Sequence, residues 1–538
     1  MLKNTPTLPT TDAYAQRLAL LAQSAHRPLL AQGLRGVEKE SLRVQHDGTL
    51  APTPHPAALG SALTHEQLTT DYSEALLEMI TPAGHAADVM LEQLDTLHRY
   101  VYESIGDELL WNASMPCVLP PEEQIPIAQY GTSNIGRLKH VYRRGLALRY
   151  GRAMQCIAGI HYNFSLHEDI WRLLQQHERV DGSPLQYQSD AYLALIRNFR
   201  RSSWLLMLLF GASPALSRSF VRERAHALDT FDADTLFLPY ATSLRMSDLG
   251  YQNTSAQAAL RADYNSLDGY LHNLANAVSQ PYAPYEQFGT QRDGEWLQIN
   301  TNVLQIENEF YSTIRPKRAT QPGERPLHAL ASRGVQYIEV RLLDIDPFEA
   351  TGISATTARF VEAYLLFCAL DASPLLHEAE CTEAGNNFAR VVTQGRRPGL
   401  ELSRGGRPLP LRDWAVELLE RIGPAAALLD AQEGGSRYGD ALAAQRAKIE
   451  DFSLTPSARV LEDMRTTGRS FTRFALEHSA QHAAGMRARP LPHELHAHYA
   501  ALAARSLQQQ AEIERTEVGH FDQFVAAYRA YTLNRISI

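Results

Sequence analysis

The sequence has few cysteines, and their spacing favours neither a zinc site nor a redox centre. Only four cysteines occur among 538 residues, at positions 117, 156, 368 and 381. No two of them form the C-x-x-C pair that is typical of zinc sites and dithiol redox centres. We therefore expect four free thiols.

Long hydrophobic runs and an excess of basic residues are also missing. The most apolar run, residues 204–210, is far shorter than the ~20 residues that cross a bilayer, so it predicts a buried helix end. The N-terminal residues are polar and include prolines where a secretory signal would be apolar, so we expect a cytoplasmic protein. Lys and Arg total 51 against 60 for Asp and Glu, which disfavours nucleic acid as a partner. No sequence feature indicates a membrane or an obligatory protein partner.

A phosphate-binding loop of a known type is absent as well. The segment nearest to a Walker A motif, Gly131–Gly136, continues with Arg-Leu instead of Lys-Ser/Thr. No G-x-G-x-x-G motif follows an expected strand. A nucleotide would therefore be held mainly by metal ions on carboxylates and by basic side chains, with local candidates Arg315, Lys317 and Arg318.

Hydrophobic periodicity divides the chain into a first part with strands and a later helical part. Apolar residues recur at helical spacing over residues 10–30 and 85–108, which predicts amphipathic helices. Period-two alternation predicts strands within residues 36–44, 75–82, 157–166, 297–311 and 335–345. From about residue 355 the pattern is helical and alanine-rich, with a Gly/Pro/Arg-rich loop at residues 395–413.

Carboxylates stand at positions of the first two expected strands where a metal could be bound. Glu38 and Glu40 are two residues apart, so a strand directs both to one face, where they could hold hard cations or simply be solvated. Glu78 interrupts an apolar run, and Asp71 stands at the entrance to that run. Because burial of an unpaired charge is costly, Glu78 is either a metal ligand or part of a structural ion pair.

Two further strands combine basic and acidic groups on one face. In residues 157–166, His161 shares a face with Asn163 and is a candidate ligand, or else a hydrogen-bonded structural histidine. In residues 335–345, Glu339 and Arg341 lie side by side. This pair suits a metal-phosphate site, since the acid holds the cation and the guanidinium neutralises phosphoryl charge; a plain cross-strand salt bridge is the alternative.

In this order, the motifs resemble one family, the bacterial single-chain glutamate-cysteine ligases, whose fold is related to that of glutamine synthetase. The resemblance covers residues 30 to 350 without a large gap and returns at residues 386–402, whereas the last hundred or so residues match poorly. The stretches that carry it are RGVEKESLRV (35–44), residues 60–82, 127–155, AGIHYNFSL (158–166), FGASPA (210–215), residues 238–251, 297–318 and YIEVRLLDIDPF (337–348).

The resemblance implies roles for individual residues. The metal ligands would be Glu38, Glu40, Asp71, Glu78, His161 and Glu339. Arg341 would act on the transferred phosphoryl group, with Glu339 and Glu38 as its catalytic neighbours. Substrates would be bound by Tyr72, Tyr142, Arg143, Leu146, Gln155, Arg245, Tyr251, Asn308 and Tyr311. Tyr72 departs from the phenylalanine that the family has at this place.

The resemblance also implies an α+β fold with a curved, mainly antiparallel sheet surrounded by helices and a helical C-terminal region. Residues 1–350 would form the catalytic core, and residues 351–538 a mainly helical remainder packed on it rather than an independent domain. The implied activity is the ATP-dependent joining of glutamate to cysteine, the first step of glutathione biosynthesis. Magnesium ions would assist, with manganese as a substitute. The alternatives are a ligase of the same fold that uses another amine and a metabolite-binding descendant without activity.

Overall fold

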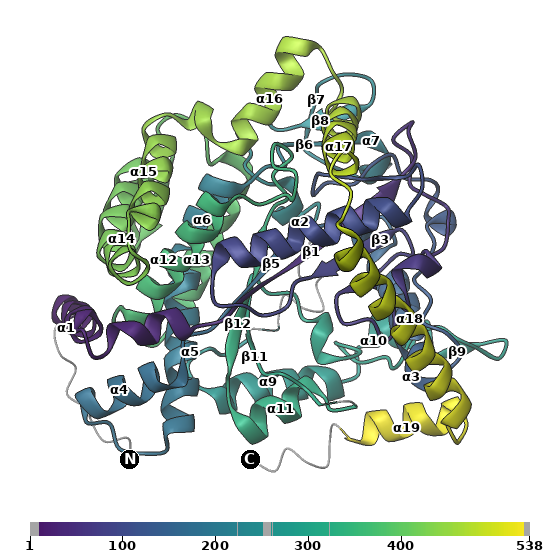
Figure 1. The fold of residues 1–538 in the computed structure, drawn as a ribbon, viewed down its shortest axis with the longest axis horizontal. Coiled ribbons are helices and arrows are strands. Elements are labelled where there is room, and N and C mark those ends of the chain that lie inside the picture. The colour runs from purple at the N-terminus through teal and green to yellow at the C-terminus, as the bar shows by residue number, and fades with distance from the viewer. Residues whose placement is uncertain (1–9, 223, 251–259, 261, 322, 532–538) are drawn as a thin grey trace.

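A seven-stranded antiparallel sheet forms the centre of the computed structural model, which describes residues 10–222, 224–250, 260, 262–321 and 323–531 (Figure 1). Its strand order is β11-β12-β5-β1-β3-β2, and β4 pairs with β1. The bounds are β1 Arg35–Val44, β2 Leu68–Thr70, β3 Leu76–Ile80, β4 Leu109–Leu110, β5 Ile160–Phe164, β11 Ile314–Lys317 and β12 Tyr337–Leu343. The strands predicted within residues 36–44, 75–82, 157–166 and 335–345 are therefore confirmed.

The strand predicted over residues 297–311 is wrong. Apart from a single helical turn at Glu307–Glu309, this segment is irregular. Its polar side chains bind nearby backbone: Gln305 accepts from the amide of Ile299 at 3.0 Å, and Asn300 donates to the carbonyl of Gln305 at 2.9 Å. Such local bonds replace the ladder that the alternating pattern would otherwise form.

Helices cover the sheet and fill the rest of the molecule. The first part of the chain contains α1 Thr10–Ala22, α2 Ala87–Ser104, α3 Asn134–Tyr150, α4 Glu168–Glu178, α5 Pro184–Ser202, α6 Trp204–Phe210, α7 Arg218–Val221, α9 Leu267–Ser279, α10 Ala283–Glu286 and α11 Pro326–Arg333. The predicted helices over residues 10–30 and 85–108 correspond to α1, with a short turn after it, and to α2. Every residue of α6 is buried, as expected for the most apolar run.

The later part of the chain is helical, as predicted from residue 355 onward. Its helices are α12 Ala355–Leu370, α13 Glu378–Gln394, α14 Leu411–Glu433, α15 Arg437–Glu450, α16 Pro456–Thr467, α17 Phe471–Arg487, α18 His493–Thr516 and α19 Phe521–Tyr531. The expected loop at residues 395–413 instead contains a hairpin of β13 Glu401–Arg404 and β14 Arg407–Pro410, which turns at two glycines of positive φ, Gly405 and Gly406.

Smaller strands lie outside the main sheet. They are β6 Ala215–Ser217, β7 Asp229–Thr230 and β8 Thr235–Phe237 in one sheet, and the hairpin of β9 Gln291–Arg292 with β10 Glu295–Trp296. The four cysteines are free, as expected. In the described part of the chain, no helix combines the length and the apolar character that crossing a membrane requires.

The face of the sheet that packs on α2 carries a buried lysine. Lys39 on β1 donates from Nζ to Nε2 of His98 on α2 at 2.9 Å and to Oδ1 of Asn112 at 3.0 Å. Since an ammonium group has only donors, His98 accepts through Nε2 and carries its proton on Nδ1, which donates to the carbonyl of Leu94 at 2.7 Å. The three side chains are nearly inaccessible to solvent, so Lys39 is fixed behind the sheet.

A buried ion pair connects the sheet to the later helices. Arg35 on β1 donates from Nε and Nη2 to both carboxylate oxygens of Glu362 on α12, at 2.9 and 3.0 Å. The hydroxyls of Tyr162 on β5 and Tyr438 on α15 also donate to Glu362, each at 2.7 Å. Burial alone would raise the pKa of Glu362, but Arg35 and these donors lower it below its ordinary value.

We expect Glu362→Gln to lower the free energy of unfolding by about 3–5 kcal/mol, because it leaves the buried charge of Arg35 uncompensated. The contribution of Glu362 is present above its unfolded-state pKa of ~4.3 and is lost as the pH falls through the lower folded-state value. Denaturant unfolding across this pH range is the measurement. Glu420→Gln, an exposed change on α14, is the control. Equal denaturation midpoints for Glu362→Gln and the wild-type chain would contradict the prediction.

The C-terminal helix α18 lies against two loops of the first part of the chain. The amide of Ser61 donates to Oγ of Ser506 at 3.0 Å, and the amide of Thr132 donates to Glu514 at 2.8 Å. Gly60 and Gly131, both of positive φ, make this approach possible: a Cβ at Gly60 would collide with Ser506, and one at Gly131 with Glu514.

Candidate functional site

Strand register aligns the predicted ligands across the sheet face opposite Lys39. Glu38 on β1 stands directly opposite His161 on β5, and Glu40 stands opposite Glu78 on β3. Glu339 on β12 pairs with Asn163 on β5 and with Arg315 on β11. Alternation along each strand therefore directs these side chains to one face, and the antiparallel pairing gathers them in rows.

These rows form the floor of a cavity of about 480 Å³, whose sides are formed by α3 and by the segment around residues 299–311. Every predicted metal ligand lines it: Glu38, Glu40, Asp71, Glu78, His161 and Glu339. The predicted catalytic residue Arg341 also lines it, as do most of the predicted substrate and nucleotide residues: Tyr72, Tyr142, Arg143, Leu146, Gln155, Arg245, Asn308, Tyr311, Arg315 and Lys317.

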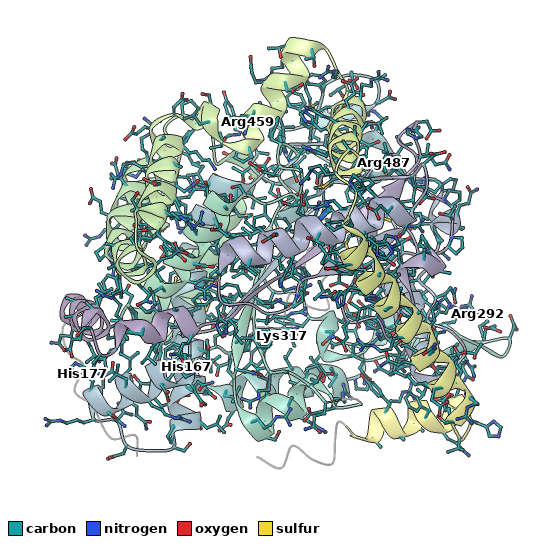
Figure 2. The ribbon with its side chains drawn as sticks, viewed as in Figure 1. His167, His177, Arg292, Lys317, Arg459 and Arg487 are labelled. Atoms are coloured by element: carbon teal, nitrogen blue, oxygen red, sulfur yellow. The ribbon has the colours of Figure 1, made fainter. Side chains whose placement is uncertain are left out.

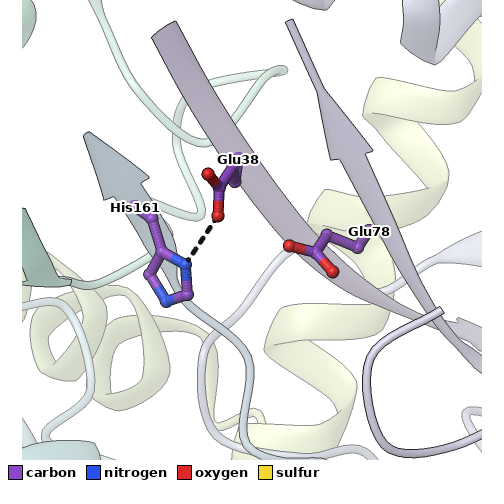
Figure 3. Close-up of side chains that lie close together, drawn as sticks. All are labelled: Glu38, Glu78 and His161. Carbon is purple, nitrogen blue, oxygen red and sulfur yellow. Dashed lines mark hydrogen bonds and ion pairs between the residues drawn. The ribbon is translucent and has the colours of Figure 1, made fainter. Parts of the chain in front are cut away.

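The acidic end of the cavity has the donor set of a divalent-cation site. Ligand atoms of Glu38, Glu78 and His161 lie within 4.8 Å of one another (Figure 3). Nδ1 of His161 is 3.2 Å from Glu38 Oε2, and its Nε2 is 3.8 Å from Glu40 Oε1. Magnesium prefers oxygen ligands and is usually held by one or two carboxylates together with waters and substrate phosphates.

The charges at this end are unbalanced in a way that fits a bound cation. Burial raises the pKa of Glu78 well above its ordinary value, and repulsion from Glu38, Asp71 and Glu40 raises it further. Partial burial would raise the pKa of Glu38 as well, yet its hydrogen bond with His161 lowers it below the ordinary value. A divalent cation would relieve the repulsion around Glu78, so the residues present fit the metal that the family resemblance implies.

Basic groups occupy the adjoining part of the same face. Lys317 Nζ lies 3.3 Å from Glu339 Oε1, and Arg341 Nη1 lies 3.2 Å from Glu339 Oε2. Burial would raise the pKa of Glu339, but Lys317 and Arg341 hold it well below its ordinary value. Figure 2 shows Lys317 at the central sheet, whereas Arg292 projects from the β9–β10 hairpin at the edge of the molecule. Lys317, Glu339 and Arg341 all line the cavity, so both ion pairs belong to its floor.

Three of the predicted residues differ from the others in their placement or contacts, or lie outside the described residues. Arg318 does not line the cavity: it follows the last residue of β11, points away from the face of Arg315 and Lys317 by strand alternation, and donates to the carbonyl of Arg333 at 2.6 Å. Arg245 lines the cavity and also donates to the carbonyl of Arg341 at 2.9 Å, a contact that stabilises β12. Tyr251 lies outside the described residues.

Several lining residues were not predicted. Ile135, Leu138, Lys139 and Tyr150 line the cavity from α3. They are three or four residues from one another or from Tyr142 and Leu146, so helical periodicity could have found them. Glu309 lines it too and pairs with Arg149 at 2.9 Å. Tyr528 on α19 is also among the lining residues, and no signal in the sequence connects it with the site.

Comparison with known proteins agrees with the geometry. The family model for glutamate-cysteine ligase matches residues 18–391. Glutamate-cysteine ligase of Janthinobacterium sp. (strain Marseille) is 59% identical over 522 residues, which are 97% of this chain and 99% of that one. The enzyme of Pseudomonas putida (strain W619) is 60% identical over 523 residues, with the same coverage of 97% and 99%.

Solved structures share the fold. The crystal structure of glutamate-cysteine ligase from Francisella tularensis in complex with AMP matches with a TM-score of 0.88 and 37% identity, covering 93% of this chain and 98% of that one. A bifunctional glutathione synthetase from Pasteurella multocida matches with a TM-score of 0.69 and 25% identity, covering 88% of this chain and 55% of that one. The α+β fold and the family resemblance are thereby confirmed, and this chain belongs to the glutamate-cysteine ligase family.

Proposed function

We propose that this protein joins the γ-carboxylate of glutamate to the amine of cysteine at the expense of ATP, giving γ-glutamylcysteine, ADP and phosphate. ATP would first phosphorylate the γ-carboxylate, and the amine would then displace phosphate from this acyl phosphate. The observation that carries the proposal is the single cavity in which a row of carboxylates with His161 adjoins Arg341, Lys317 and Arg315 on one sheet face. The AMP bound to the Francisella tularensis relative supports a nucleotide co-substrate.

The acidic row would hold magnesium or manganese ions through Glu38, Glu78 and His161, joined by Glu40, Asp71 and Glu339. Such ions supply charge neutralisation between the triphosphate and the attacking carboxylate. Arg341 and Lys317 project from β12 and β11 next to this row, so they neutralise the equatorial oxygens of the transferred phosphoryl group. Glu339 orients the side chains of Lys317 and Arg341, one through each of its carboxylate oxygens. Arg315, beside them, is the further contact for phosphate oxygens.

The amino acids would bind toward α3. Tyr72, Tyr142, Leu146, Gln155 and Tyr311 offer a mostly apolar and aromatic surface for the cysteine side chain. Arg143, Arg245 and Asn308 line the same cavity and supply polar groups for the substrate carboxylates. The hydroxyl of Tyr72 is buried and has no hydrogen-bond partner among the described residues, so it is available to the cysteine thiol.

ADP formation tests the proposal directly. The purified protein is incubated with ATP and magnesium and with glutamate alone, with cysteine alone, and with both. ADP and γ-glutamylcysteine formed in equal amounts only with both amino acids would support the function. A series of other amines offered in place of cysteine tests the alternative, a ligase of the same fold that uses another amine. Faster turnover with one of them would identify that amine, instead of cysteine, as the acceptor.

We expect 2-aminobutyrate to be ligated more slowly than cysteine but measurably. The nucleophile is the α-amine, and an apolar pocket discriminates a methyl from a thiol by only ~1–3 kcal/mol. Glycine and alanine should be poorer, because they leave the pocket partly empty, and leucine should be excluded by its size. The measurement is kcat/KM for each amine at fixed glutamate.

Tyr72→Phe is the matched variant for this series. If its hydroxyl contacts the thiol, the preference for cysteine over 2-aminobutyrate should shrink in the variant. Complete inactivity of the wild-type protein with 2-aminobutyrate would contradict the expectation and show that turnover requires a polar contact to the sulfur.

We further propose that residues 351–538 do not form an independent domain. One hydrophobic cluster contains buried residues from Tyr14 to Tyr499. The bond between Arg35 and Glu362 lies within this continuous core.

A further inference from the structure

The last described helix packs on the outer end of the cavity. Phe521 and Val525 of α19 are buried against Leu138 and Val141 of α3 and against Ile299. Arg137 lies over the ring of Phe521, with Cζ 4.2 Å from its centroid. The apolar side of α19 is thus directed to the two segments that form the sides of the cavity.

Polar contacts fix α19 at both of its ends. Trp296 Nε1 donates to Asp522 Oδ1 at 2.8 Å, and the guanidinium of Arg529 donates to the carbonyl of Ile299. Arg325 lies over the ring of Tyr528, with Cζ 4.7 Å from its centroid, and donates to the Tyr528 carbonyl at 3.3 Å. Arg325 is itself held in a buried ion pair with Glu307. The helix is therefore anchored to the core rather than laid loosely upon it.

Tyr528 separates two cavities. It lines the reaction cavity and also a neighbouring cavity of about 280 Å³, and Ile299 is the other residue that lines both. The neighbouring cavity is mostly polar, with Asn300, Asn302 and Gln305 among its lining residues. Polar surroundings of this size hold water. Once substrates fill the reaction cavity, the aromatic ring and Ile299 form an apolar partition between the substrates and this water-holding space.

We propose that α19 is the outer wall of the reaction cavity and that the ring of Tyr528 keeps water from the acyl phosphate until the amine attacks. This inference rests on the proposed function. In the productive step the amine nitrogen bonds to the acyl carbon, the bond from that carbon to the phosphate oxygen breaks, and the proton that the amine loses leaves with the phosphate. If water attacks instead, the same bond breaks, glutamate is regenerated and phosphate leaves, so ATP is consumed without product. Excluding water from a closed site prevents such side reactions.

The ratio of ADP to γ-glutamylcysteine measures this role. Tyr528→Ala removes the ring, and we expect it to form several-fold more ADP than γ-glutamylcysteine, whereas the wild-type protein forms the two in equal amounts. Tyr528→Phe keeps the ring and should keep the equal ratio. Gln523→Ala, on the exposed side of the same helix, is the matched control. An unchanged ratio in Tyr528→Ala would overturn the proposal, even if its overall rate were lower.

Hydrogen exchange gives a second, independent measurement on the unmodified protein. Addition of magnesium, glutamate and a non-hydrolysable ATP analogue should slow amide exchange in residues 521–531 more than in residues 493–510. Equal slowing in both segments would overturn the wall assignment. Failure of the wild-type protein to form γ-glutamylcysteine would instead refute the proposed function, so the two failures are distinguishable.

Discussion

Glu78→Gln is expected to lower the turnover number by about 10²–10³-fold while the fold is retained. Glutamine keeps the shape of the side chain but removes the charge that binds a divalent cation. Glu78 stands opposite Glu40, and its ligand atom lies within 4.8 Å of those of Glu38 and His161, so it belongs to the centre of the donor set. Glu38→Gln and Glu339→Gln should lower turnover in the same way.

Stability separates a metal-binding role of Glu78 from a structural one. Burial and the neighbouring carboxylates raise the pKa of Glu78, so its ionised form destabilises the metal-free protein at neutral pH. Without magnesium, Glu78→Gln should therefore unfold at the same or a higher denaturant concentration than the wild-type protein.

The measurements for Glu78→Gln are turnover at saturating magnesium, Mn²⁺ binding by paramagnetic resonance, and denaturant unfolding. Glu66→Gln, an exposed change close to β2, is the control. Near-normal turnover together with unchanged Mn²⁺ affinity would refute the assignment of Glu78.

Arg341→Lys should lower kcat by about 10²–10³-fold and change KM for glutamate far less. The guanidinium lies 3.2 Å from Glu339, which also pairs with Lys317, and the proposed mechanism places the developing phosphoryl charge beside it. An ammonium group keeps the positive charge but cannot reproduce the planar, bidentate geometry of the guanidinium. A group that acts mainly in the transition state affects kcat, whereas one that only anchors substrate affects KM.

Initial rates over a range of glutamate concentrations separate these outcomes for Arg341→Lys. Arg292→Lys on the exposed β9–β10 hairpin is the control and should leave both constants unchanged. A variant altered only in KM for glutamate would assign Arg341 to substrate anchoring instead of phosphoryl transfer.

Strand alternation was sufficient to predict the faces of the central strands. Glu38 with Glu40, and Glu339 with Arg341, do share one face, and Lys39 lies on the other. The alignment of Glu38 with His161 depends on which strands pair and in which register, and a single strand carries no information on either. The resemblance to a known family supplied that part.

Contacts between distant segments explain what could not be predicted. Residues 297–311 alternate like a strand, but amide side chains of this segment also donate to backbone carbonyls of other segments, those of Tyr285, Val278 and Tyr142. Tyr528 reaches the cavity only because α19 packs on α3 and Ile299, which are far away in the sequence. Arg318 appeared equivalent to Lys317 in a basic cluster, yet strand alternation directs it elsewhere.

The buried Lys39 has a consequence for the accuracy of folding. A shift of β1 by one residue would exchange its two faces, so Glu38 and Glu40 would meet α2 and Lys39 would enter the acidic row. In that arrangement the unprotonated Nε2 of His98 would face a carboxylate, and neither group has a proton to donate. Buried, unpaired carboxylates are costly, so misregistered pairing of β1 is disfavoured on the face of the sheet that packs on α2. The alternation Glu-Lys-Glu thereby selects the correct strand register as well as the chemistry of the cavity.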